Sequence, residues 1–148
     1  MLELLAISFT FTSLVKILLI IIINMIVGNL WYSPLGFQKQ WMKAMKWSDC
    51  ETCDSKVVMM ALFMAHLGTL LSSIFLNLLL IAFNIRKHQY LSAMLTAGIL
   101  CGFYAFNGWN RVFFTKKSDR QSQRTLYLID ISYKFVLYSL VSLVLVSF

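Results

Sequence analysis

Two ionisable residues lie one helical turn apart inside an otherwise apolar stretch of the sequence. Asp130 and Lys134 fall within Leu126 to Val146, which is rich in Leu, Val, Ile, Phe and Tyr. A charged side chain at the centre of a membrane helix costs about 2.5–3.5 kcal/mol on translocation scales, so such residues normally face a protein interior or a wet cavity. We therefore expect this pair to face the inside of a helix bundle.

Helical spacing places further polar side chains on inward-facing stripes of the other apolar segments. These stripes, together with the polar residues near the end of the third segment, predict one intramembrane binding cluster. Its expected members are Asp130, Lys134, His66, Asn24, Asn77, Asn107, Asn110 and Arg111.

Three interpretations of this cluster stay open. In the structural one, Asp130 and Lys134 at i and i+4 neutralise each other while the amides fix helix register. In the transport one, the proton or ion occupancy of Asp130 changes, with Lys134 as counter-charge and His66 as a relay. In the binding one, Arg111, Lys134 and the asparagines hold an anionic headgroup or solute.

Signals for catalysis are poor. Cys50 and Cys53 form a lone CxxC pair, whereas a closed zinc site needs more ligands, so we expect no metal and no cofactor. No nucleophile with a matching base and acid can be assembled from the sequence. A membrane-embedded lipid-modifying enzyme that uses Asp130 and His66 is the least favoured alternative.

The elements that must position these residues follow from composition. Of 148 residues, 59% are hydrophobic and 13% are charged, which leaves too little polar surface to cover a soluble globule. Four segments are long enough to span a bilayer at about 20 residues per crossing. With one Pro and six Gly in the chain, they read as continuous helices. We predict an all-α membrane protein, a single four-transmembrane-helix bundle over residues 1–148, with spans at 11–33, 57–83, 90–114 and 126–147.

Basic residues predict the orientation of the bundle. The first and third connections, with the span ends beside them, carry nine of the 13 Lys and Arg residues: Lys39, Lys43, Lys46, Lys56, Arg111, Lys116, Lys117, Arg120 and Arg124. By the positive-inside rule these connections are cytoplasmic and both termini are outside. Contact with anionic lipid headgroups explains the net charge of +7, so no nucleic-acid partner is expected.

The first connection predicts an amphipathic helix in the membrane interface. Ser33 and Pro34 suit a cap and a first helical turn, and the helix is expected over residues 34–47. Its lysines fall on one side and its apolar residues on the other, namely Phe37, Trp41, Ala44 and Met45. We expect this helix to lie among acyl chains as an anchor, with a lateral gate or a docking face as alternatives.

Two motifs carry a resemblance to a known family. The first is Leu30-Trp31-Tyr32-Ser33-Pro34-Leu35-Gly36-Phe37 followed by Lys39, Trp41, Met42 and Lys43; the second is Leu128-Ile129-Asp130 followed by Tyr133. They resemble the first-span and last-span motifs of a bacterial family of four-helix membrane proteins of unknown function. The resemblance implies the fold and no activity. The family's Tyr is commonly followed by His, and Lys134 stands there in this sequence.

The sequence favours a non-enzymatic accessory or binding component of the membrane, expected in a bacterial inner membrane. A small-solute or ion transporter is the second candidate. A homo-oligomer or another membrane protein is the expected partner. Gly98, Gly102 and Ala105 form a small-residue face that suits close helix contact, either inside the bundle or between copies.

Overall fold

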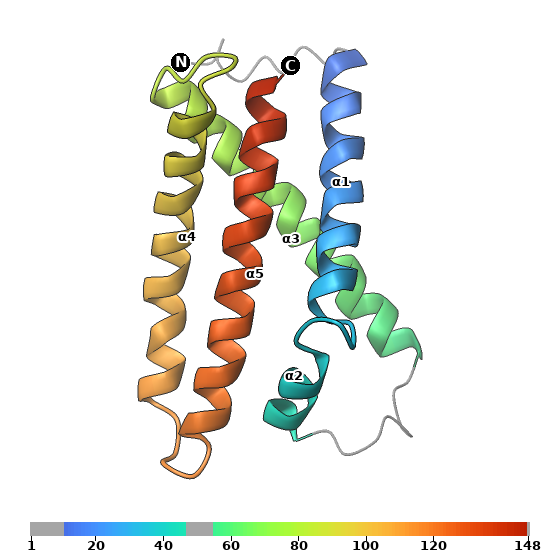
Figure 1. The fold of residues 1–148 in the computed structure, drawn as a ribbon, viewed down its shortest axis with the longest axis vertical. Coiled ribbons are helices and arrows are strands. Elements are labelled where there is room, and N and C mark those ends of the chain that lie inside the picture. Colours follow the sequence, from blue (N-terminus) through green and yellow to red (C-terminus); the bar gives the residue numbers. More distant parts are fainter. Residues whose placement is uncertain (1–10, 47–54, 148) are drawn as a thin grey trace.

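A computed structural model of the protein describes residues 11–46 and 55–147, so Cys50 and Cys53 lie outside the described part. The described ranges form five α-helices: α1 (Phe11–Trp31), α2 (Gln38–Met45), α3 (Ser55–Ala82), α4 (Tyr90–Phe113) and α5 (Arg120–Ser147), shown in Figure 1. Four of them, α1, α3, α4 and α5, are long and apolar enough to cross a membrane. The predicted all-α fold with four membrane helices is confirmed.

Helix α5 begins well before the apolar span that was expected near residue 126. It starts at Arg120, and its first turns are polar. Arg and Gln are good helix formers, so the helix extends past the part of the chain that hydropathy marks as a span. Part of the expected connector is therefore helical.

Helix α5 is the centre of the bundle. It packs against each of α1, α2, α3 and α4. Helix α3 crosses behind it obliquely, near α4 at the end where α1 begins and α5 ends, and away from α4 at the opposite end (Figure 1). The two ends of the bundle are therefore packed differently.

The best-packed core lies in the half of the bundle where α1 begins and α5 ends. Leu76, Ala97, Leu137 and Val141 are each at most 1% exposed there and belong to α3, α4 and α5. Ile20 of α1 joins the same cluster. Apolar side chains from four helices thus fill this half, and the polar residues gather in the other.

The α1–α2 connection is a tight turn and not the start of the expected helix. Ser33 donates its hydroxyl back to Leu30 O at 2.9 Å, and Phe37 N donates to Trp31 O at 2.7 Å. These bonds satisfy carbonyls that the end of α1 leaves unpaired. Gly36 makes the turn possible, because a Cβ there would lie 2.5 Å from Trp31 O. The prediction that Ser33 and Pro34 begin the helix is wrong, and α2 starts at Gln38.

Helix α2 is amphipathic, but its apolar face turns partly toward the bundle. It packs against α5, with Ala44 buried. Trp41 packs edge-on against Tyr32, with ring centroids 5.8 Å apart. Lys46 Nζ lies 2.6 Å from Asp119 Oδ1 in the turn before α5. Helix α5 therefore covers part of this face, and the contact of the rest with acyl chains stays a prediction.

Two carbonyl groups at the C-terminal end of α5 accept hydrogen bonds from donors outside the helix. Lys16 Nζ donates to Leu145 O at 3.2 Å, and the backbone N–H of His88 donates to Val146 O at 2.9 Å. Both carbonyls belong to the last turn, where a helix has no partners of its own and carries a partial negative charge. Lys16 thus has a structural partner at membrane depth.

The small-residue face of α4 does not line the bundle interior. A Cβ added at Gly98 or Gly102 would meet no atom of the described chain within 4 Å. Both glycines instead border a shallow groove on the outside of the bundle, beside Ile131 and Phe135 of α5. Of the two roles expected for this face, packing inside the bundle is contradicted at Gly98 and Gly102, and contact between copies stays a prediction.

Candidate functional site

A cavity of about 1000 Å³ occupies the other half of the bundle, where α4 ends and α5 begins. All five helices contribute to its wall, and most of the predicted polar cluster lies on it. Its polar and aromatic lining residues are Asn24, Asn29, Tyr32, Trp41, His66, Tyr104, Asn107, Arg111, Gln123, Tyr127, Asp130, Tyr133 and Lys134. The volume is at the upper end of the range for small-molecule sites, about 300–1,000 Å³.

The two sequence motifs meet on this wall. Tyr32 donates its hydroxyl to Asp130 Oδ1 at 2.9 Å, and the neighbouring Trp31 Nε1 donates to Ile129 O at 3.1 Å. The rings of Tyr32 and Tyr133 pack with centroids 5.6 Å apart. The end of the first span is therefore fixed to the middle of the last by residues of both motifs.

The side chain of Asn24 joins the same two helices, α1 and α5, at a point further from the α1–α2 turn. It is 5% exposed, and its Oδ1 accepts a hydrogen bond from the Tyr133 hydroxyl at 2.5 Å. The Tyr133 hydroxyl also lies beside Gly28, where a Cβ would be in ordinary van der Waals contact with it at 3.6 Å. Asn24 thus acts as predicted for a register-fixing amide, with a tyrosine as its partner.

Asp130 and Lys134 do not form the expected ion pair. Lys134 Nζ lies over the ring of Tyr104, 4.5 Å from its centroid, and 5.8 Å from that of Tyr138. Within the described ranges, the ion pair found at 4.0 Å or less is Lys46 with Asp119. The competing partners explain the difference, because Tyr32 takes the carboxylate and an aromatic face takes the ammonium.

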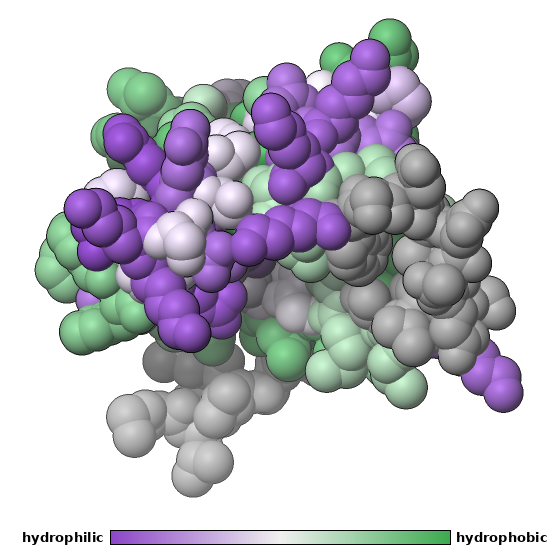
Figure 2. All heavy atoms as spheres, turned by 90° about the horizontal axis from the view of Figure 1, so that it is seen from below, coloured by the Kyte–Doolittle hydropathy of each residue, from purple (hydrophilic) through white to green (hydrophobic). Residues whose placement is uncertain are grey.

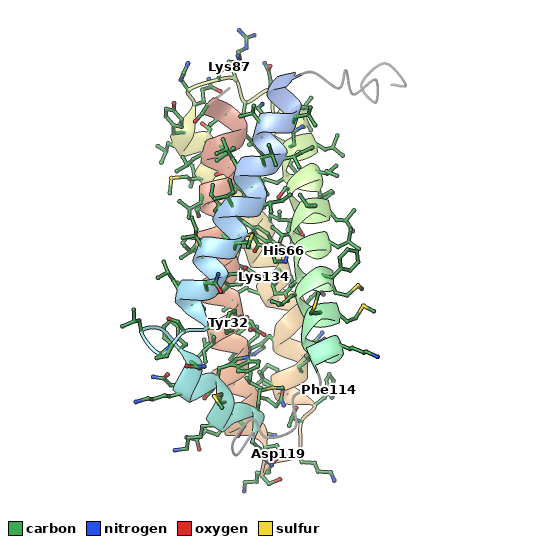
Figure 3. All side chains as sticks on the ribbon, turned by 90° about the vertical axis from the view of Figure 1, so that its right-hand side faces the viewer. Tyr32, His66, Lys87, Phe114, Asp119 and Lys134 are labelled. Atoms are coloured by element: carbon green, nitrogen blue, oxygen red, sulfur yellow. The ribbon has the colours of Figure 1, made fainter. Side chains whose placement is uncertain are left out.

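His66 reaches the cavity from α3. Its Nδ1 lies 2.7 Å from Leu62 O in the preceding turn, and a carbonyl only accepts, so Nδ1 carries the proton. The second ring nitrogen is left for other contacts. Figure 3 shows His66 on α3 and Lys134 on α5 at a similar height. Tyr32 lies nearer the basic end, which is the end of the bundle that carries α2 and the α4–α5 connection.

Two of the predicted residues are not on the cavity wall. Asn107 and Arg111 of α4 line it, whereas Asn110 and Asn77 do not. Asn110 is exposed and is turned about 100° from Arg111 around the helix. Asn77 shares the stripe of His66, but at about 1.5 Å per residue it lies about 16 Å further along α3.

Sequence reasoning missed Tyr104 and Gln123. Tyr104 precedes Arg111 by seven residues, a spacing that places both on one helix face and that could have found it. Gln123 was missed because the residues before position 126 were expected to form a connector and not part of a helix. Tyr127 closes the wall near them by donating its hydroxyl to Ala105 O at 2.9 Å.

Burial controls the protonation of Tyr32, which lies just after α1. Burial, and next the nearby Asp130 carboxylate, raise the pKa of Tyr32 far above its usual value of 10.0. The hydroxyl therefore stays protonated at neutral pH and donates to the carboxylate. A hydrogen bond to an ionised group is about twice as strong as one between neutral groups.

The cavity wall carries charged groups and hydrogen-bond donors of the kind found in binding sites. Arg111 and Lys134 bring two positive charges and Asp130 one negative charge, while amide and tyrosine groups supply hydrogen bonds. The described residues contain no group of three or more His, Cys, Asp or Glu side chains that could hold a metal ion.

One comparison with known proteins gives a match. The family model described as "Protein of unknown function (DUF1761)" matches residues 15–146. No curated protein and no solved structure matches the chain.

Proposed function

The chain belongs to the DUF1761 family of proteins of unknown function, and from that premise we propose that it is a non-enzymatic membrane protein that binds a small polar or amphiphilic molecule. The observation that carries the proposal is the cavity of about 1000 Å³, where Arg111, Lys134 and Asp130 lie among tyrosines and amides. A large concave site with a few convergent polar groups is the usual form of a binding site.

The packing of the bundle favours binding over passage. The cavity occupies one half, and Leu76, Ala97 and Leu137 fill the other with almost no exposed surface. A molecule that enters from the basic end meets this core. Side chains in such cores are close-packed, so a path through them needs a rearrangement.

The hydrogen bonds of His66 and Asp130, the two residues with possible acid-base roles, do not join them as a catalytic pair. His66 Nδ1 is bonded to Leu62 O, and Asp130 accepts from Tyr32. Both groups therefore have structural partners. A lipid-modifying reaction remains the least supported of the three functions.

Native mass spectrometry of the protein released from nanodiscs tests the binding proposal. Ala65 lies on the cavity wall, so Ala65→Trp should obstruct part of the site, while Leu67→Trp places the same ring two residues away and off the wall. We expect a bound molecule in the wild type and in Leu67→Trp, and its loss in Ala65→Trp. An equal bound mass in all three proteins, or none in the wild type, would overturn the proposal.

The same spectra test the proposed partner, which is either a second copy of the chain or another membrane protein. An accessory component is expected to be released with a stoichiometric partner when it is captured gently from native membranes. A protein that is released only as a single copy contradicts this part of the proposal.

Transport of a small solute or ion is the second candidate, favoured by the position of Asp130 on the cavity wall. An intramembrane carboxylate is a typical coupling group in transporters. Asp130→Asn should then abolish coupled flux in vesicles and leave the fold intact. A wild type with no specific flux would reject transport and leave binding in place.

We also propose that the basic end faces the cytoplasm of a bacterial inner membrane, with both termini outside. The support is the positive-inside rule, applied to the basic residues around α2 and the α4–α5 connection. In a chain whose native cysteines are replaced by serine, Gln89→Cys should react with an impermeant maleimide in intact cells. Ser118→Cys should react only after the membrane is opened, and the reverse pattern would refute this orientation.

A further inference from the structure

The cavity holds a cation from a membrane helix that makes no ion pair with a carboxylate of the described residues. Lys134 lies in the membrane helix α5, and its Nζ lies over the ring of Tyr104. No carboxylate of the described residues comes within 4.0 Å of it, since Asp130 is held by Tyr32. A charge in this position is stabilised strongly by an anion that enters the cavity.

A second cation on the same wall suits a phosphate group. Arg111 comes from the last turn of α4, and its exposed side chain lines the cavity together with Lys134. The planar guanidinium presents paired N–H donors that match two oxygens of a phosphate, and an ammonium adds a compact point charge. With Asp130 counted, the charged side chains on the wall still sum to one positive charge.

Part of the cavity wall is apolar and exposed on α1 and α3. Met25 of α1 is 50% exposed and Leu62 of α3 is 55% exposed, although both line the cavity. Both lie within segments long and apolar enough to cross a membrane, so their exposed surfaces face the region of acyl chains. A molecule with a polar head and apolar tails can therefore enter between α1 and α3.

The surroundings of this exposed part of the wall match the headgroup region of a bilayer. Trp31, Tyr32 and Trp41 gather at this end, as aromatic residues do at membrane interfaces. Figure 2 shows hydrophilic side chains gathered over the same end. A basic surface of this kind attracts anionic lipids and raises their local concentration.

We infer that the cavity binds the phosphodiester group of an anionic phospholipid, with Arg111 and Lys134 as its ligands and the acyl chains leaving between α1 and α3. This inference rests on the binding function proposed above and names its ligand class. The exposed apolar part of the wall favours a lipid over a free phosphate, because a free ion gains nothing from Met25 and Leu62. Repulsion by two cations disfavours a headgroup that carries its own positive charge.

The test is a titration of the purified full-length protein, followed by native mass spectrometry. The probes are short-chain phosphatidylglycerol, short-chain phosphatidylcholine and glycerol 3-phosphate. We expect phosphatidylglycerol to bind at least about tenfold more tightly than either of the others. Equal binding of phosphatidylcholine would show that headgroup charge is not recognised, and equal binding of glycerol 3-phosphate would assign the site to a free solute. Either result overturns the inference.

Charge variants locate the site. Arg111→Gln and Lys134→Met should each weaken phosphatidylglycerol binding by about tenfold, since each removes one charged partner of the phosphate. Lys117→Gln removes the same charge from the α4–α5 connection, outside the cavity, and should change the affinity less than about twofold. Lys134→Arg keeps the charge and should retain binding if Lys134→Met proves unstable. A loss as large in Lys117→Gln as in Arg111→Gln would show nonspecific surface attraction and overturn the inference.

The outcome for the lipid is separable from the outcome for the binding function. If phosphatidylglycerol binds weakly while Ala65→Trp still removes another bound molecule, the lipid inference fails and the binding function stands. If Ala65→Trp removes nothing and no probe binds, both fail.

Discussion

The hydroxyl of Tyr32 lies 2.9 Å from Asp130 Oδ1 and donates a hydrogen bond to it, which joins the residue after α1 to the middle of α5. Residues 98 positions apart in the sequence thus form one contact at the cavity wall. The bond also takes up the carboxylate that helical spacing assigned to Lys134. This contact therefore holds the chain that follows α1 against α5 and keeps the Asp130 carboxylate at the cavity wall.

Loss of the Tyr32 hydroxyl should destabilise the bundle. Tyr32→Phe leaves the Asp130 carboxylate without its donor, and we expect the free energy of unfolding to fall by about 1–3 kcal/mol. Denaturant titration in detergent measures the change. Tyr104→Phe is the matched control, because its hydroxyl makes no hydrogen bond in the described ranges and its ring still faces Lys134. In the Asp130→Asn background the Tyr32→Phe effect should shrink, and equal effects in both backgrounds would contradict the coupling.

Stability should fall at alkaline pH through Tyr32. Its folded-state pKa is raised above the usual 10.0, so folding favours the protonated form. The contribution is complete below the unfolded-state pKa and is lost as the pH rises from about 10 toward the folded-state pKa. Unfolding free energies measured across this window should fall more steeply in the wild type than in Tyr32→Phe. Parallel slopes would exclude this role, since the two proteins differ only in the Tyr32 hydroxyl.

Two glycine-to-alanine changes should have opposite effects. In Gly36→Ala the new Cβ meets Leu30 O and lies 2.5 Å from Trp31 O, so the α1–α2 turn must open, at a cost of about 1–3 kcal/mol. In Gly102→Ala the Cβ meets open space, and the better helix propensity of Ala adds up to about 1 kcal/mol. Thermal unfolding of the two variants checks both signs. Destabilisation by Gly102→Ala would mean that the outer face of α4 is covered.

Removal of the Lys16 ammonium should loosen the last turn of α5. Lys16→Met keeps a long side chain and loses the donor to Leu145 O, and we expect a loss of about 0.5–2 kcal/mol. Lys87→Met removes a charge at the same end and serves as the control. Hydrogen exchange of the last amides of α5 locates the effect. Unchanged exchange in Lys16→Met would show that His88 closes this end without help.

Sequence patterns predicted the elements well because a bilayer imposes length and hydropathy on each span. The apolar runs of α1, α3 and α4 begin and end close to the helices themselves. Hydropathy could not find the start of α5, because the polar residues that follow Arg120 are helical outside the apolar run. It could not find the α1–α2 turn either, since Pro34 suits a first helical turn as well as a loop.

The sequence predicted most of the residues that line the site, but not which of them contact each other. Helical spacing relates residues within one span, and for this reason it assigned Lys134 to Asp130. The contacts that the structure shows, Tyr32 with Asp130 and Asn24 with Tyr133, join different helices. Such contacts depend on the rotation and depth of each helix, which spacing within one span does not fix. Distance along the axis would have separated Asn77 from His66, since 11 residues correspond to about 16 Å.

The central position of α5 also sets an order of events during biogenesis. Each of the other four helices packs on α5, and α5 is the last of them in chain order. Helices α1 to α4 therefore leave the ribosome before α5, the helix that they pack against, has been synthesised. Lipid tails are as apolar as these helices, so the waiting segments have little drive to associate. The cavity is thus a product of late assembly, and it exists only after α5 has been synthesised.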